Sequence, residues 1–157
     1  MGPVMKASQL WKIYPSGEST IQAVKGVSLE VEVGEMVAIM GPSGCGKTTL
    51  LNILSGIDEP HSGEVMVKEQ PLFGISDDAR TRMRAEHLGF IFQDFNLLPV
   101  LSAVENVELP MLLLGHSASE SRSSALEALA SVGLEDRAEH RPAELSGGQQ
   151  QRVAVAR

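Results

Sequence analysis

The stretch GPSGCGKTTL, Gly41 to Leu50, constrains the fold more than any other, because it places a glycine-rich loop between two apolar segments. Before it, Met36–Met40 is apolar throughout, which is typical of a strand buried on both faces of a parallel sheet. After it, the residues predict a helix that begins at Lys47 and ends near Gly56. A strand, a tight loop and a helix in this order predict an α/β fold.

The loop itself has the spacing G-x-x-x-x-G-K-[ST]. Small residues let successive backbone N–H groups turn toward phosphate oxygens, which a larger side chain would keep away. The lysine brings a positive charge to the terminal phosphates, the threonine offers a hydroxyl to Mg²⁺, and the helix N-terminus adds its partial positive charge. The spacing therefore predicts a nucleotide site that is formed by Gly41, Ser43, Gly44, Cys45, Gly46, Lys47, Thr48 and Thr49, with Thr48 as a metal ligand.

The remainder of the first half is rich in predicted strands. Val27–Val33 alternates apolar and polar residues, as a strand with one buried face does. Two further strands are expected at Glu64–Lys68 and Leu88–Gln93. A helix is expected from about Asp77 to Glu86, because its two leading aspartates suit the positive end of a helix dipole.

Helices dominate the second half, and we expect a subdomain boundary near Phe95 to Pro99. Ser102–Glu105 and Ser117–Glu120 each have the form of a capping box, in which the first and last residues satisfy each other's backbone N–H groups. The second box predicts a helix that is stopped by Gly133. Four of its residues are expected to share one apolar face: Ala125, Leu126, Leu129 and Val132.

Composition narrows the class of protein. The 20 acidic residues outnumber the 13 Lys and Arg residues, and the resulting net charge of −7 argues against nucleic acid as a partner. Cys45 is the single cysteine, which excludes an intrachain disulfide and fits a reducing compartment. No apolar run is long enough to span a bilayer, and the first residues do not resemble a secretory signal, so we expect a cytoplasmic protein.

A second candidate anion site stands near the end of the sequence, in ELSGGQQQRVAVAR. Ser146 to Gln149 has the S-x-x-Q form of a capping box, which places the serine at a helix N-terminus. Gly147 and Gly148 then leave backbone N–H groups uncovered. The pattern predicts a helix end that can hold a phosphate group.

With both motifs present, the chain resembles the ATP-binding subunits of ABC transporters from its first residues to its last. The resemblance is strongest to the subfamily of lipoprotein-releasing and macrolide-export ATPases, through GFIFQDFNLLP, ENVELP and VGLEDRAEHRPAELSGGQQQRVAVAR. It implies an ATP-hydrolysing subunit of an export or lipoprotein-release complex, peripheral on the inner face of the cell membrane. It also implies a P-loop (RecA-like) core with an N-terminal antiparallel β subdomain over about 1–94, and a helical lobe over about 95–157.

The resemblance also assigns roles to residues outside the loop. Tyr14 matches the position of an aromatic ring that stacks on adenine, with Trp11 as a weaker candidate. Gln93 matches a glutamine that ligates Mg²⁺ or orients water and senses the membrane subunit. Residues 94–99 would lie in the groove that receives a helix of an integral membrane permease. In a head-to-tail dimer the partner's ATP would be contacted by Ser146, Gly147, Gly148 and Gln149.

In this family the helix that follows LSGGQ, the signature helix, leads to the Walker B strand, which ends in aspartate and glutamate, and later to a histidine. We find neither that strand nor that histidine within the 157 residues. We therefore expect the sequence to be an N-terminal fragment, ending before the Walker B strand, that binds ATP without turning it over. One alternative is a small P-loop kinase with Asp94 as its acid, which leaves LSGGQ unexplained. Another is a non-transport ABC ATPase, whose paired cassettes or long insertions are not seen here.

Overall fold

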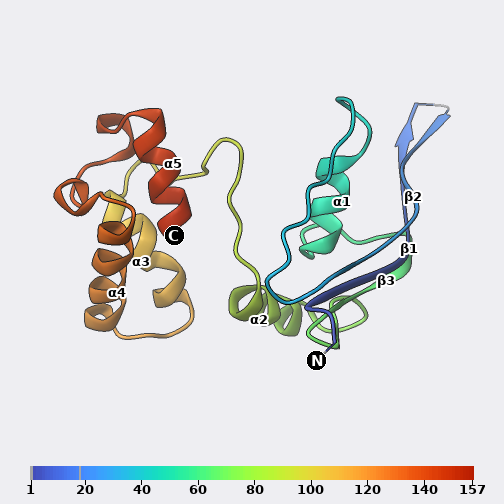
Figure 1. Ribbon diagram of the computed structural model, residues 1–157, viewed down its shortest axis with the longest axis horizontal. Coiled ribbons are helices and arrows are strands. Elements are labelled where there is room, and N and C mark those ends of the chain that lie inside the picture. Colours follow the sequence, from blue (N-terminus) through green and yellow to red (C-terminus); the bar gives the residue numbers. More distant parts are fainter. Residues whose placement is uncertain (1, 18) are drawn as a thin grey trace. The chain divides into compact units, whose positions relative to one another are not determined.

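The computed structural model describes residues 2–17 and 19–157, which divide into two compact units, Met1–Leu88 and Gly89–Arg157 (Figure 1). Each unit has its own hydrophobic core. The first unit combines a sheet with two helices, and the second is helical. The chain is therefore an α/β protein, as its sequence predicts.

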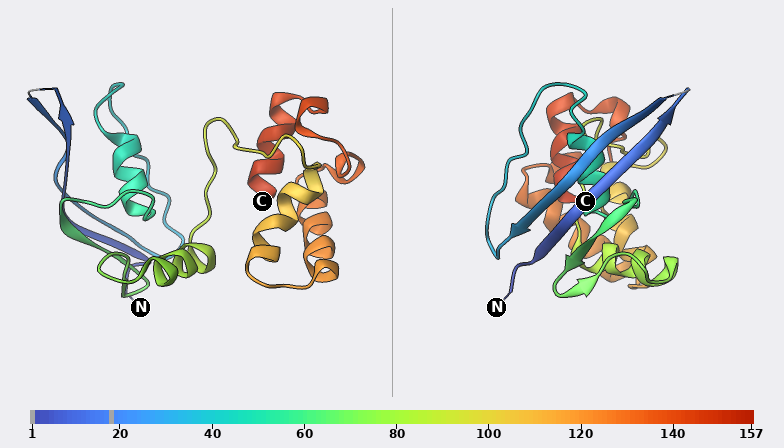
Figure 2. Two further views of the ribbon diagram at one scale, coloured as in Figure 1. Left: turned by 180° about the vertical axis from the view of Figure 1, so that it is seen from behind. Right: turned by 90° about the vertical axis from the view of Figure 1, so that its right-hand side faces the viewer.

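The first unit is built on a four-stranded antiparallel sheet with the strand order β2-β1-β3-β4. The two longest strands, β1 and β2, lie side by side in both views of Figure 2. A two-residue turn at Lys68 and Glu69, both with positive φ, joins β3 to β4 and ends β3 at Val67, one residue before the expected end. The strands are β1 Met5–Ser16, β2 Ser19–Val31, β3 Ser62–Val67 and β4 Gln70–Pro71.

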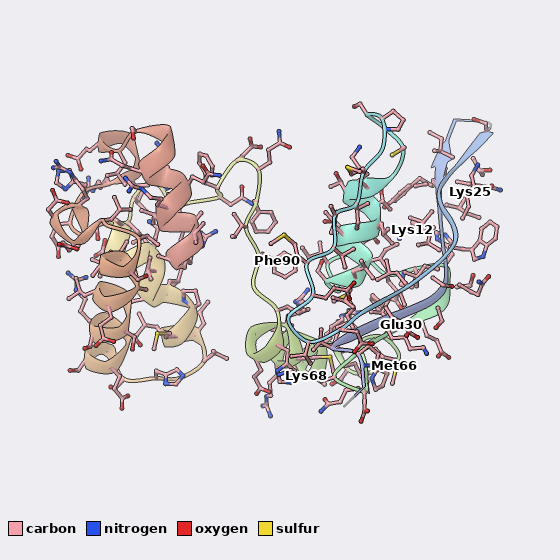
Figure 3. The ribbon with its side chains drawn as sticks, viewed as in Figure 1. Lys12, Lys25, Glu30, Met66, Lys68 and Phe90 are labelled. Carbon is pink, nitrogen blue, oxygen red and sulfur yellow. The ribbon has the colours of Figure 1, made fainter. Side chains whose placement is uncertain are left out.

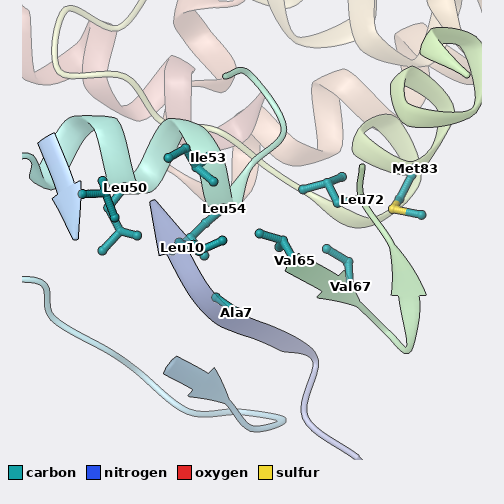
Figure 4. Packing of buried hydrophobic residues seen from close by; sticks show 10 residues of the cluster. Ala7, Leu10, Leu50, Ile53, Leu54, Val65, Val67, Leu72 and Met83 are labelled. Atoms are coloured by element: carbon teal, nitrogen blue, oxygen red, sulfur yellow. The ribbon is translucent and has the colours of Figure 1, made fainter. Parts of the chain in front are cut away.

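Two helices accompany the sheet, α1 Lys47–Leu54 and α2 Asp77–His87, close to their expected bounds. Helix α1 turns its apolar face toward β1 and β3, as Figure 4 shows. Burying these side chains stabilises the unit by about 25 cal/mol for each Å² of apolar surface removed from water. The buried cluster contains Ala7, Leu10, Val24, Leu50, Ile53, Leu54, Val65, Val67, Leu72 and Met83.

Two expected strands, Met36–Met40 and Leu88–Gln93, are not formed. Both segments are extended or irregular, and Met36 and Met40 are almost fully exposed, at 96% and 88%. The physical reason is that a strand needs a hydrogen-bonded neighbour, and within residues 2–17 and 19–157 neither segment has one. The expected strand Val27–Val33 is present as the end of β2, which stops at Val31.

The second unit packs three helices, α3 Ala103–Leu113, α4 Ala118–Ser131 and α5 Gly147–Ala156, with two short 3-10 turns, η1 Glu135–Arg137 and η2 Pro142–Glu144. The capping boxes at Ser102 and Ser117 are confirmed, as both partners of each box are hydrogen-bonded. Gly133, with φ +68°, follows the end of α4 as expected. The expected face of α4 is only partly correct, since Ala125 and Leu129 are buried while Leu126 is exposed.

No helix formed by the described residues is both long enough and apolar enough to cross a membrane.

Candidate functional site

The glycine-rich loop runs from the irregular segment before Gly41 into the first turn of α1. Gly41, Gly44 and Gly46 all have positive φ, which glycine adopts without a steric penalty. Gly46 is the N-cap of α1 and carries no side chain, so no side-chain cap covers the backbone N–H groups of the first turn. These N–H groups are left for an anion, which is what a phosphate site requires.

Lys47 lies inside this loop. Its Nζ donates to the carbonyl oxygens of Gly41 and Pro42, each at 2.8 Å, and lies 3.8 Å from Cys45 Sγ. The ammonium group is therefore held over the same backbone turn whose N–H groups are expected to face phosphate. Cys45 is exposed beside it.

Gly46 also fixes how closely α1 approaches the sheet. A Cβ built at this position would lie 2.1 Å from the carbonyl oxygen of Ala23 in β2, far inside van der Waals contact. The start of α1 therefore packs on the backbone of β2, at a distance that only glycine allows.

Replacing this glycine provides a stability test. Gly46→Ala should lower the free energy of unfolding by roughly 2–5 kcal/mol, because overpacking against Ala23 adds to backbone strain at φ +94°. Gly44→Ala is the matched control: it has φ +79° but open space around its Cβ, so only about 1–2 kcal/mol should be lost. Urea unfolding of both variants measures the difference, and equal losses would contradict the close packing of α1 on β2.

Tyr14, expected to stack on adenine, lies on β1 and is 36% exposed. Its hydroxyl donates to Asp58 Oδ2 at 2.5 Å, and the Thr49 side chain lies near it. Trp11, the weaker candidate, instead lies against Gly26, where a Cβ would meet its indole ring at 3.4 Å. Of the two aromatic residues, Tyr14 is thus the one near α1, the helix that follows the loop 41–46.

A buried lysine, Lys12, binds the same carboxylate as Tyr14. Lys12 is labelled in Figure 3; its Nζ donates to Asp58 Oδ1 and to the Glu59 carbonyl oxygen, both at 2.6 Å. Burial opposes ionisation of Asp58, but the hydrogen bonds from Lys12 and Tyr14 outweigh it and hold the pKa of this carboxyl below its ordinary value. The bond to Asp58 raises the pKa of the Tyr14 hydroxyl. Asp58 therefore stays ionised and Tyr14 stays protonated near neutral pH.

Gln93 and Asp94 lie in the second unit, at the two central positions of a turn in which the Phe95 N–H donates to the Phe92 carbonyl oxygen at 3.1 Å. Both side chains are exposed. The turn is not the end of a strand, so the predicted setting of Gln93 is wrong. Its predicted roles remain predictions.

The segment that follows this turn is held from two sides. The Arg157 guanidinium donates to the carbonyl oxygens of Asn96 and Phe95, at 2.7 and 3.0 Å. Asn106, which is completely buried, accepts from the Leu98 N–H at 2.7 Å and donates to the Leu98 carbonyl oxygen at 3.1 Å. Leu98 itself remains 42% exposed, so the segment presents an ordered apolar side chain to the outside.

The second glycine pair has the geometry that its motif predicts. Ser146 Oγ accepts from the Gln149 N–H at 3.3 Å, and Gln149 Oε1 accepts from the Ser146 N–H at 2.8 Å, which confirms the capping box. Gly147 and Gly148 are exposed, and a Cβ at either position would meet nothing within 4 Å. Their N–H groups therefore lie at an open helix end.

The predicted residues thus form two groups. Tyr14 and the loop 41–49 belong to the first unit, whereas Gln93 and Ser146–Gln149 belong to the second. Sequence reasoning missed Lys12 and Asp58. The alternation of β1 offered a signal for Lys12, because residues two apart on a strand share a face, but nothing local indicated Asp58.

The family model for ABC transporters matches residues 24–157. An uncharacterised ABC transporter ATP-binding protein of Thermotoga maritima is 50% identical over 157 residues, which are 100% of this chain and 67% of that protein. A macrolide export ATP-binding/permease protein, MacB of Burkholderia pseudomallei, is 47% identical over 99% of this chain and 24% of its own length.

The solved structures agree with the sequences. The ATP-binding cassette MJ0796, in a dimeric post-hydrolysis state bound to ADP and Pi, is matched with a TM-score of 0.89 and 47% identity. The match covers 97% of this chain and 67% of that chain. A second dimeric structure of the same cassette, described as a bacterial ABC transporter cassette, has the same TM-score.

Proposed function

This chain belongs to the ABC transporter family, and we propose that it is the ATP-binding part of an export or lipoprotein-release complex that couples ATP to a membrane partner. The observation that carries the proposal is the loop 41–46 at the uncapped N-terminus of α1, with Lys47 held within it. The MacB relatives are macrolide export proteins, which favours an exporter. Members of this family hydrolyse ATP.

ATP would bind with its phosphates against the loop. The backbone N–H groups of the first turn of α1 would donate to phosphate oxygens, and Lys47 would exchange its two carbonyl contacts for the terminal phosphates. The exposed Thr48 hydroxyl, at the start of α1, suits a hard cation such as Mg²⁺. Gln93 is proposed as a second ligand of that ion.

Adenine would stack on Tyr14. Its ring is 36% exposed and its hydroxyl lies near Thr49, so the proposed base and phosphate sites would be neighbours in one unit. Stacking on an aromatic ring suits any flat base, because it uses the π-face and not a hydrogen-bond pattern.

The open end of α5 would complete the ATP site of a second copy. In a head-to-tail dimer, the loop of one copy and the open α5 end of the other would lie on opposite sides of one ATP. The matched cassette is dimeric, which supports this arrangement. We assign Ser146, Gly147, Gly148 and Gln149 to the partner's γ-phosphate.

The segment 94–99 would face the integral membrane permease. Its backbone is held by Arg157 and Asn106 while Leu98 stays exposed, so it offers an apolar contact of fixed shape. The permease-fused MacB relatives support a membrane partner, and we propose that the domain lies on the cytoplasmic membrane surface. The negative net charge supports a protein partner over nucleic acid.

Cys45 provides the test. Its thiol is exposed and lies within the loop, 3.8 Å from Lys47 Nζ, so bound phosphates should shield it. MgATP is expected to slow modification of Cys45 by a maleimide in proportion to the occupied fraction of sites. The same MgATP concentration should protect Lys47→Ala far less. An unchanged rate at saturating MgATP would exclude Cys45 and its loop from the nucleotide site.

A further inference from the structure

One carboxylate organises the surroundings of Tyr14. Asp58 Oδ1 accepts from Lys12 Nζ at 2.6 Å, and Asp58 Oδ2 accepts from the Tyr14 hydroxyl at 2.5 Å. Both oxygens of Asp58 are therefore used, and both donors come from β1. Lys12 is anchored a second time by the Glu59 carbonyl oxygen, at 2.6 Å.

The same arrangement fixes the ring of Tyr14 at two places. Lys12 Nζ lies over the ring, 5.2 Å from its centroid, and the hydroxyl at the far end is tied to Asp58 and lies near Thr49. Thr49 belongs to α1, the helix that begins in the phosphate loop. The ring is thereby held in a defined position relative to that loop.

This ordering is more than the core of the unit requires. Lys12 is buried and its charge needs a partner, which the ion pair with Asp58 supplies. Tyr14 is 36% exposed, so fixing its hydroxyl adds little to core packing. An exposed ring that is held in one orientation binds a flat ligand better, since less rotational freedom is lost on binding.

We propose that Asp58, anchored by Lys12, is a positioning residue that holds the Tyr14 ring in the orientation in which it stacks on the base of the bound nucleotide. The inference rests on the proposed function, because it presupposes that a nucleotide occupies the loop 41–49. It adds that part of the nucleotide's affinity is set by Asp58, a residue that touches neither base nor phosphate in this assignment.

The experiment compares two ligands that share phosphates but not a base, MgATP and Mg-tripolyphosphate, by isothermal titration calorimetry. Tyr14→Phe keeps the ring and the Lys12–Asp58 pair but removes the hydroxyl bond. It should weaken MgATP binding roughly three- to tenfold, the usual effect of losing one hydrogen bond. Mg-tripolyphosphate, which has no base to stack, should bind within about twofold of wild type.

Asp58→Ala removes the same bond from the other side, and its effect on MgATP should match that of Tyr14→Phe. The double variant should bind MgATP no more weakly than either single variant, because both act through one interaction. Glu30→Ala is the control. It removes an exposed ion pair on the same sheet, in which Lys6 Nζ lies 2.6 Å from Glu30 Oε1. Its affinities for both ligands should equal those of wild type.

Tyr14→Phe leaves the buried Lys12 paired, so it decides the matter even where Asp58→Ala unfolds the unit. Unchanged MgATP affinity in Tyr14→Phe would overturn the inference alone and leave the nucleotide site in place. A parallel loss of both ligands would also overturn it, by showing that Asp58 supports the phosphate loop instead of the base platform. A wild-type protein that binds neither ligand would overturn the proposed function as well.

Discussion

Lys47→Ala is expected to weaken MgATP binding by about 10- to 150-fold, the range for losing one hydrogen-bonded charge at an anionic ligand. Among the described residues, the Lys47 ammonium donates hydrogen bonds to the Gly41 and Pro42 carbonyl oxygens and to the Cys45 sulfur. Those bonds fold the side chain over the loop and place its charge where phosphates would lie. Alanine removes the charge while α1 keeps its own backbone hydrogen bonds.

The matched control is Lys68→Ala, in the β3–β4 turn of the same unit. It removes an equal positive charge that lies outside the loop 41–48, so it should leave MgATP affinity unchanged. Titration of a fluorescent ATP analogue against both variants gives the two affinities. Equal affinities for Lys47→Ala and Lys68→Ala would show that the loop 41–48 is not the phosphate site.

Gly147→Asp is expected to lower the rate of ATP hydrolysis by the assembled transporter by about a hundredfold or more. The reason is that a carboxylate would then face the partner's γ-phosphate. The substitution should not harm the fold. A Cβ at Gly147 meets nothing within 4 Å, and an acidic residue in the first turn of a helix is stabilising. MgATP binding by the single chain should also be unchanged, since its own loop lies on the other unit.

Ala118→Asp is the control for this variant. Ala118 is the first residue of α4, follows an equivalent serine cap at Ser117 and is exposed. It should therefore gain the same small stabilisation without any effect on hydrolysis. Wild-type hydrolysis in Gly147→Asp, with melting temperatures matched, would remove α5 from the catalytic assembly.

Features that depend on neighbours in the sequence were predictable. The loop 41–48 is a matter of residue types at fixed spacing, and the capping boxes at Ser102, Ser117 and Ser146 each join residues three apart. Local bonding of this kind forms wherever the helix begins. The capping box at the start of α5 could therefore be predicted down to the Ser146–Gln149 contact.

Features that depend on distant parts of the chain were not predictable in the same way. Met36–Met40 has the composition of a buried strand, yet without a paired neighbour in the described chain it stays irregular and exposed. The Tyr14–Asp58 bond joins residues 44 apart, and no spacing rule covers it. Asn106 is likewise fully buried in α3 and accepts a hydrogen bond from the Leu98 N–H, and no pattern in the sequence indicated this role.

The central claim is that each ATP is held by the loop of one subunit and the α5 end of its partner, and a mixing experiment tests it most directly. Whole transporter subunits that carry Lys47→Ala or Gly147→Asp are each assembled alone and then mixed in equal amounts, and ATP hydrolysis is measured. Neither variant alone should turn over ATP, but the mixture should recover up to about a quarter of wild-type activity. About half of its dimers are mixed, and each of those holds one complete site. A mixture as inactive as the two variants alone would contradict the shared site.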